Sequence, residues 1–171
     1  MRMRVWGSAL VLLFAAGWMG LGSVALAADS SVAEPVTLAA DWKLQDASKV
    51  TQAGAEIASA KYKPEGWYSA TVPGTVLTSL VNAGVYPEPL YGENNRPDKI
   101  PDSLARTQYW YRTVFEVPKA YAGKHVWLNL EGINFSAQVW VNGRQVGTMR
   151  GAFRRGIFDI SPDVKIGRAH V

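Results

Sequence analysis

The residues best suited to do chemistry in this 171-residue chain lie in a polar segment directly before an aromatic strand pattern. Residues 85–103 are rich in Pro, Gly, Asn and charge, and segments of this length without periodicity are typical of functional or disordered loops. Four of its side chains could bind a ligand: Tyr91, Asn94, Asn95 and Arg96. Residues 108–117, "QYWYRTVFEV", follow, and there Trp110 and Arg112 alternate with the core-like positions.

This combination of side chains suits a sugar. A sugar presents a rim of hydroxyl groups and apolar C–H faces, so amide and guanidinium groups bind the rim while an aromatic ring stacks on the face. The same composition also fits a solvated loop beside tryptophans that other loops cover. The residues alone leave both interpretations open.

The residue types give little support for metal binding, nucleophilic catalysis or phosphate binding. The chain has no cysteine and only two histidines, His125 and His170. No nucleophile elbow or phosphate-binding glycine loop is present. The carboxylates that could form a glycosidic pair all lie in the irregular segment, where a solvated role is the default: Glu88, Glu93, Asp98 and Asp102. We therefore expect no catalytic residue, no metal and no cofactor in this chain.

Short strand patterns dominate the second half of the chain. They cover residues 109–117, 124–131, 137–141, 145–149 and 156–160, and Asn142 and Gly143 form a two-residue hairpin turn between two of them. Earlier strands are expected at residues 41–47 and 67–72, and Thr75 can cap one short helix that ends at Gly84. This pattern predicts an antiparallel sandwich or barrel.

Alternation assigns a core face and an outer face to these strands. The expected core residues are Tyr111, Thr113, Phe115, Val117, Val126, Leu128, Leu130, Ala137, Val139 and Val141. The opposite faces hold Trp110, Arg112, Trp127, Asn129, Gln138 and Trp140. Three outward tryptophans exceed the apolar surface of an ordinary free-standing domain, so either a partner or loops should cover them.

The amino-terminal segment has the features of a signal peptide. Arg2 and Arg4 precede an apolar run, and a small-x-small site ends at Ala27, so we expect a signal peptide at residues 1–27, a linker at 28–40 and a domain at 41–164. The protein would then be exported to a periplasm or to the medium. An uncleaved membrane anchor is the alternative, because the apolar run is nearly long enough to span a bilayer.

Residues 165–171 read "KIGRAHV", and the DNA that would encode this peptide indicates an artificial origin. They are what AAG ATC GGA AGA GCA CAC GTC encodes, and that resembles the start of a common sequencing-library adapter, so we expect native sequence to end near Val164. The signal and this tail carry four of the 18 basic residues, which leaves 14 against 14 acidic residues. A nearly neutral domain excludes a nucleic-acid partner.

Several phrases of the sequence carry a family resemblance: "VPGTVLTSLVNAG", "PLYGENN", "YWYRTVFEVP", "LNLEGINFSAQVWVNGRQVG" and "GAFRRGIFDIS". Over residues 41–164 the chain resembles the amino-terminal sugar-binding domain of glycoside hydrolase family 2. Within that family it is most similar to exo-β-D-glucosaminidases and β-mannosidases.

The resemblance implies an all-β fold, a galactose-binding-like jelly-roll β-sandwich that is truncated at its carboxyl end and packs against a (β/α)8 barrel. Two barrel glutamates would perform a retaining hydrolysis, and neither is in this chain, so we expect the chain to be inactive alone. By motif position Asn94 would reach the terminal sugar, with Asn95 as the alternate. Trp110, Arg112 and Phe153 would line or support the same edge.

The expected function is therefore that of a non-catalytic domain in an exported exo-acting β-glycosidase. Its expected partners are a terminal β-linked sugar, such as glucosamine or mannose, and the missing barrel, with no nucleic acid and no membrane after signal cleavage. The identity of the sugar would depend on barrel loops. The alternative is a free-standing carbohydrate-binding module or an envelope interaction protein.

Overall fold

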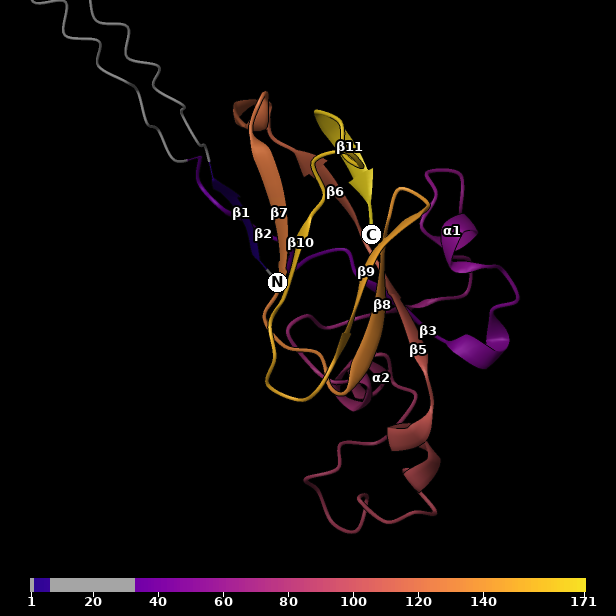
Figure 1. Cartoon of the computed structure of the whole chain (residues 1–171). Helices are drawn as coiled ribbons and strands as arrows, with labels where there is room; N and C mark the ends of the chain where they lie inside the picture. Colours follow the sequence, from indigo (N-terminus) through magenta and orange to yellow (C-terminus); the bar gives the residue numbers. More distant parts are fainter. Residues whose placement is uncertain (1, 7–32) are drawn as a thin grey trace, which may run out of the picture.

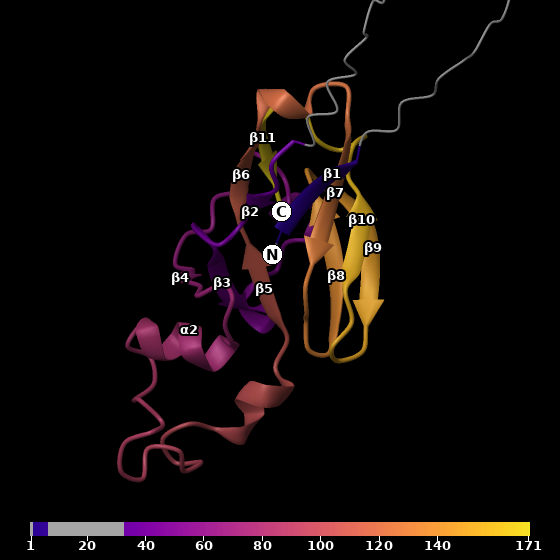
Figure 2. The same ribbon diagram turned by 90° about the vertical axis from the view of Figure 1, so that its left-hand side faces the viewer.

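The computed structural model describes residues 2–6 and 33–171, and these fold mostly into strands arranged in two layers (Figures 1 and 2). The first layer contains a three-stranded antiparallel sheet in the order β4 (Tyr68–Ser69), β3 (Lys43–Asp46) and β5 (Tyr109–Arg112). After Thr113 the chain continues as β6 (Val114–Val117), which pairs with β11 (Gly167–His170). The predicted single strand at 109–117 is thus two strands, joined at one residue.

The second layer is built around β7 (His125–Leu130), the longest strand of its sheet. The strand order of this sheet is β10 (Gly156–Asp159), β7, β1 (Arg2–Trp6) and β2 (Val36–Thr37). Beside it lies the hairpin of β8 (Ser136–Val141) and β9 (Arg144–Arg150). Asn142 and Gly143 have φ of 48° and 88°, so the predicted hairpin turn with positive φ is confirmed.

The core lies between the two layers and contains eight of the ten residues that alternation assigned to it, while Tyr111 and Ala137 are only partly buried. Thr113, Phe115, Val117, Val126, Leu128, Leu130, Val139 and Val141 are all buried. Trp42 joins them and donates its indole N–H to the carbonyl of Leu38 at 3.0 Å. The prediction of an all-β sandwich is confirmed.

Helical elements are short and lie at the periphery. The predicted helix is α2 (Val76–Asn82), which begins where the hydroxyl of Thr75 accepts the amide hydrogen of Thr78. The remaining elements are α1 (Gly54–Ile57), η1 (Ala47–Lys49), η2 (Asp102–Arg106) and η3 (Lys119–Tyr121). Among the described residues, no helix has both the length and the apolar character to cross a membrane.

The segment around α1 covers one side of the sandwich and changes the expected exposure of the outer faces. A Cβ on Gly54 would come within 2.6 Å of the ring of Trp140, so α1 packs directly on β8. Arg112, expected on an open face, is only 4% exposed and bonds to the same segment. Asn129 is also buried rather than outward-facing. The tryptophans at 110, 127 and 140 are each half-buried, and α1 covers the last of them.

The chain ends make strand contacts of their own. Arg2–Trp6, within the expected signal peptide, pairs with β7, while residue 1 and residues 7–27 lie outside the described residues. The described part of the expected linker contributes Ala33 and Leu38 to the core, so packed structure begins before Asp41. The expected adapter-derived tail forms β11 against β6. The signal peptide and the adapter origin stay predictions.

Candidate functional site

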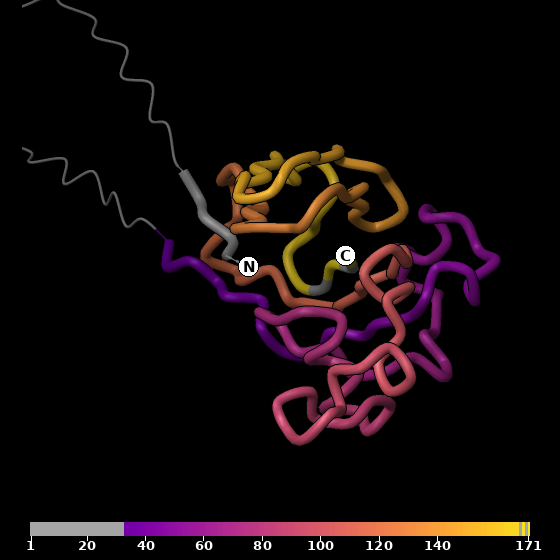
Figure 3. The backbone as a smooth tube through the Cα atoms, turned by 90° about the horizontal axis from the view of Figure 1, so that it is seen from below, coloured from indigo at the N-terminus to yellow at the C-terminus, as the bar shows by residue number. Residues whose placement is uncertain are grey.

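The loop between α2 and η2 extends beyond the strands at one end of the sandwich, and Figure 3 views the molecule from that end. Asn94 helps to close it, because its side-chain amide donates to the carbonyl of Glu88 at 3.0 Å and its backbone amide donates to the carbonyl of Tyr91 at 3.2 Å. Glu93 and Arg96 form an exposed ion pair across the same turn. The loop is therefore folded on itself.

Asn94 and Asn95 have different environments within this turn. Asn94 is half-buried and uses its Nδ2 within the loop, so its Oδ1 is the atom suited to accept a bond from a ligand hydroxyl. Asn95 is exposed and makes no side-chain hydrogen bond to the described residues. Leu90 and Tyr91 are 89% and 73% exposed beside them. Tyr91 and Asn95 are thus exposed in this loop, and Asn94 is half-buried between them in the sequence.

Trp110 and Arg112 lie on β5, which follows this loop through η2. Trp110 is half-buried opposite Gln45 of β3. Arg112 donates from Nε to the carbonyl of Ile57 at 2.9 Å and from Nη2 to the carbonyl of Ser59 at 3.1 Å, and its guanidinium lies 5.9 Å from the centre of the Tyr62 ring. Burial lowers the pKa of Arg112 from its usual value, with Tyr62 opposing the shift. The side chain anchors residues 57–62 to β5.

Phe153 lies in the β9–β10 connection, at the same end of the molecule as the long loop (Figures 1 and 2). Its side chain is fully exposed and its φ is 59°. Phe135, in the neighbouring β7–β8 connection, is 52% exposed, and the guanidinium of Arg150 lies 5.6 Å from its ring centre. The loops of Asn94, Asn95 and Phe153 thus lie at the same end of the molecule but on different layers (Figure 2), whereas Arg112 lies further along β5.

Sequence reasoning overlooked the arginines of this end. Arg150, Arg154 and Arg155 occupy the end of β9 and the connection to β10. The signal that could have identified them is "RGAFRRG", in which three cations and an aromatic residue fall between two strands.

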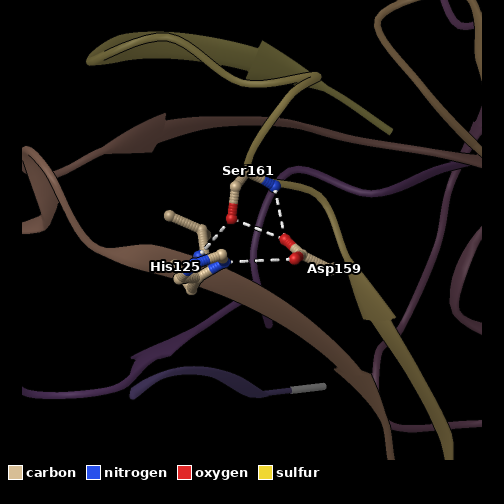
Figure 4. A network of polar contacts seen from close by, with 4 residues as sticks. His125, Asp159 and Ser161 are labelled. Atoms are coloured by element: carbon tan, nitrogen blue, oxygen red, sulfur yellow. Dashed lines mark hydrogen bonds and ion pairs between the residues drawn. The ribbon is translucent and has the colours of Figure 1, made fainter. Parts of the chain in front are cut away.

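A histidine, an aspartate and a serine meet at the opposite end of β7, but not in a nucleophilic arrangement (Figure 4). His125 Nδ1 lies 3.2 Å from Asp159 Oδ2, while Ser161 donates its hydroxyl to Asp159 Oδ1 at 2.5 Å and accepts the amide hydrogen of Val126 at 2.8 Å. In a catalytic triad the imidazole lies between the serine and the carboxylate. Here the carboxylate lies between the other two, so the cluster joins the end of β10 to the start of β7.

The described part of the chain contains no candidate metal site. No cluster of three or more potential ligands occurs among those residues. Tyr109, the first residue of β5, has a raised pKa because burial and the nearby Asp46 disfavour its phenolate. Its hydroxyl is therefore a neutral donor near pH 7.

Strand order and layering together define a galactose-binding-like β-sandwich domain. The chain belongs to the glycosyl hydrolase 2 galactose-binding domain-like family, whose family model matches residues 42–171. The expected family and fold class are thus confirmed.

The similar proteins are much longer than this chain. An exo-β-D-glucosaminidase of Streptomyces avermitilis is 34% identical over 81% of this chain, which spans only 15% of that protein. A mannosylglycoprotein endo-β-mannosidase of Lilium longiflorum is 38% identical over 56% of this chain and 10% of its own length. Among solved structures, a variant of exo-chitosanase CsxA from Amycolatopsis orientalis in complex with PNP-β-D-glucosamine matches with a TM-score of 0.66 and 27% identity, over 75% of this chain and 15% of that one.

Proposed function

We propose that this chain is the amino-terminal, non-catalytic domain of an exported exo-acting β-glycosidase of the exo-β-D-glucosaminidase or β-mannosidase type. The observation that carries the proposal is the family match over residues 42–171, together with relatives of which the chain spans about 15%. Both catalytic glutamates of the proposed parent enzyme would then lie in its barrel, outside this chain. The name of the Streptomyces relative and the PNP-β-D-glucosamine complex favour an amino sugar as the substrate.

In this proposal the long loop contributes polar contacts to the terminal sugar. Asn94 Oδ1 accepts a sugar hydroxyl while Nδ2 holds the loop closed on Glu88, and Asn95 is the alternate contact. Trp110 and Phe153 line the same edge. Arg112 supports it indirectly, because its two bonds to the carbonyls of Ile57 and Ser59 fix the segment that covers β5.

Kinetics of the full-length parent test this assignment. Asn94→Ala should lower kcat/KM for an aryl β-D-glucosaminide by about tenfold to a hundredfold, the scale of one or two lost hydrogen bonds in the transition state. Asn94→Asp keeps the acceptor but loses the bond to Glu88, so it separates contact from loop closure. If Asn94→Ala leaves kcat/KM unchanged and Asn95→Ala lowers it, Asn95 is the residue that contacts the sugar. If neither substitution lowers kcat/KM, the loop does not contact the sugar.

Two further observations test the domain's place in a longer enzyme. The chain of residues 1–171 should show no turnover of aryl β-glycosides, and measurable turnover would refute a purely assisting role. The downstream reading frame should encode a catalytic barrel, whereas a stop codon in the native gene would favour a free-standing binding module.

For export, sequencing the amino terminus of the protein recovered outside the cytoplasm should show a start near Ala28.

A further inference from the structure

We infer that the groove between the end of β9 and the start of β10 is a binding site for the carboxylate or sulfate group of an acidic glycan. The groove has a volume of about 250 Å³. It is lined by Thr148, Met149, Arg150, Arg154, Arg155, Gly156, Ile157 and Phe158. That the ligand is a glycan rests on the proposed function; that it is anionic rests on the groove itself.

The groove exists because two neighbouring strands approach closely without pairing. Each strand pairs on its other side, β9 with β8 and β10 with β7, and no ladder joins β9 to β10 among the described residues. The ring of Phe158 lies between them against two glycines, since a Cβ on Gly147 or Gly156 would fall within 2.3 Å or 2.7 Å of that ring. The groove lies beside this ring.

The cations of the groove are only partly neutralised. Arg155 forms an ion pair with Glu131 at 3.2 Å. Arg150 lies over the Phe135 ring, and Arg154 packs its stem against Gly151, where an added Cβ would lie 2.9 Å from Arg154 Cδ. Neither Arg150 nor Arg154 pairs with a carboxylate of the described residues. Two guanidinium groups therefore remain available at one groove, and guanidinium is the side chain that best matches a carboxylate or sulfate.

An aromatic contact beside the charge favours a sugar over a free anion. Phe153 is fully exposed within the same connection, at a positive φ of 59°. An acidic sugar could stack its C–H face on this ring while its charged group meets Arg150 and Arg154. The groove would thus favour glycans that carry negative charge.

Binding to the full 171-residue chain tests the inference with two probes that differ only at carbon 6. We expect p-nitrophenyl β-D-glucuronide to shift the backbone amide signals of residues 148–158 in an NMR titration, with a dissociation constant on the order of millimolar, and the neutral glucoside to leave them unmoved. The glucoside 6-sulfate tells whether sulfate serves as well as carboxylate. Affinity should fall as salt is added, because the charged groups are exposed.

Charge-removing variants locate the site. Arg150→Gln and Arg154→Gln should each weaken glucuronide binding about threefold to tenfold, the usual range for one exposed charge-assisted contact. Lys119→Gln removes the same charge from η3 at the opposite end of β7 and should change nothing. Both groove arginines are exposed, so dispersed amide spectra will verify that the variants remain folded.

Three results would overturn the inference: no titration at these amides, equal binding of the neutral glucoside, or inorganic sulfate alone binding as tightly as the glucuronide. The last would mean an anion site without sugar recognition. Glucosaminidase kinetics of the parent report separately on the proposed function, so loss of one conclusion leaves the other testable.

Discussion

At the scale of single residues, Arg112 shows how a residue type that suggests ligand binding can serve the fold. Its guanidinium is buried and donates to two backbone carbonyls more than 50 residues earlier in the chain. The Ile57 carbonyl belongs to the last residue of α1 and the Ser59 carbonyl to the turn that follows, and neither takes part in a strand ladder. The arginine therefore substitutes for regular backbone pairing at the side of the sandwich.

Replacing Arg112 should therefore lower stability. Arg112→Met retains much of the buried volume but removes the donor to the Ile57 carbonyl and leaves the Ser59 carbonyl only its bond from the Tyr62 amide, which should cost about 2–4 kcal/mol in the free energy of unfolding. Urea unfolding measures the difference. Arg106→Met at an exposed position of η2 is the control and should stay within about 0.5 kcal/mol of the parent. Equal effects of the two substitutions would contradict a structural role for Arg112.

A second residue-scale prediction concerns pH and Asp159. Bonds from the hydroxyl and the amide of Ser161 lower the pKa of Asp159, His125 adds to that, and partial burial opposes it. A carboxyl whose folded pKa lies below its unfolded value of about 3.9 contributes stability above that value and loses it as pH falls through the folded pKa. The parent should thus be more stable to urea than Asp159→Asn at pH 6. This difference should disappear as the pH falls below about 4.

Urea midpoints of both proteins across that range provide the measurement. Asp98→Asn, which removes an exposed carboxylate 3.8 Å from Lys99, is the matched control and should leave the midpoint nearly unchanged. A gap that stays constant down to pH 2 would show that the Asp159 carboxylate adds nothing as an anion.

At the scale of elements, the close approach of β9 and β10 depends on glycine. Gly147 lies where an added Cβ would meet the Phe158 ring at 2.3 Å, a distance that no relaxed packing tolerates. The ring itself fills the space that a hydrogen-bonded ladder would otherwise close. Both the core contact and the groove beside it follow from the packing of Phe158 on Gly147.

Gly147→Ala should therefore destabilise the domain by about 1–3 kcal/mol through overpacking. Phe158→Leu in the same chain should recover part of that loss, and the double-mutant cycle should give a coupling energy of about 0.5 kcal/mol or more. Gly132→Ala, whose added Cβ meets nothing within 4 Å, is the control. Strict additivity of the two substitutions would refute the proposed contact.

At the scale of the whole molecule, the buried residues of the described core all lie at or after Ala33. Arg2–Trp6 adds backbone pairing to β7, and cleavage of the expected signal peptide would remove it. A chain that begins at Ala28 should then unfold cooperatively, with a thermal midpoint within a few degrees of the full chain. Loss of a cooperative transition in circular dichroism would show that β1 belongs to the functional fold.

Sequence alone was sufficient for most strands and for eight of the ten expected core residues, because period-two alternation follows directly from backbone geometry. It also identified the Asn142–Gly143 turn, since few residues accept the positive φ that such a turn needs. The family phrases added the sandwich topology and the loop of Asn94 and Asn95.

Only the tertiary structure decided which outer faces are covered. α1 is a four-residue helix with too little periodicity to be visible in the sequence, and its position depends on Trp140 and Arg112 from distant strands. The arginine groove likewise requires that the ends of β9 and β10 lie side by side around Phe158. Alternation states that a strand has two faces, but what packs on each face is set by long-range contacts that no local pattern encodes.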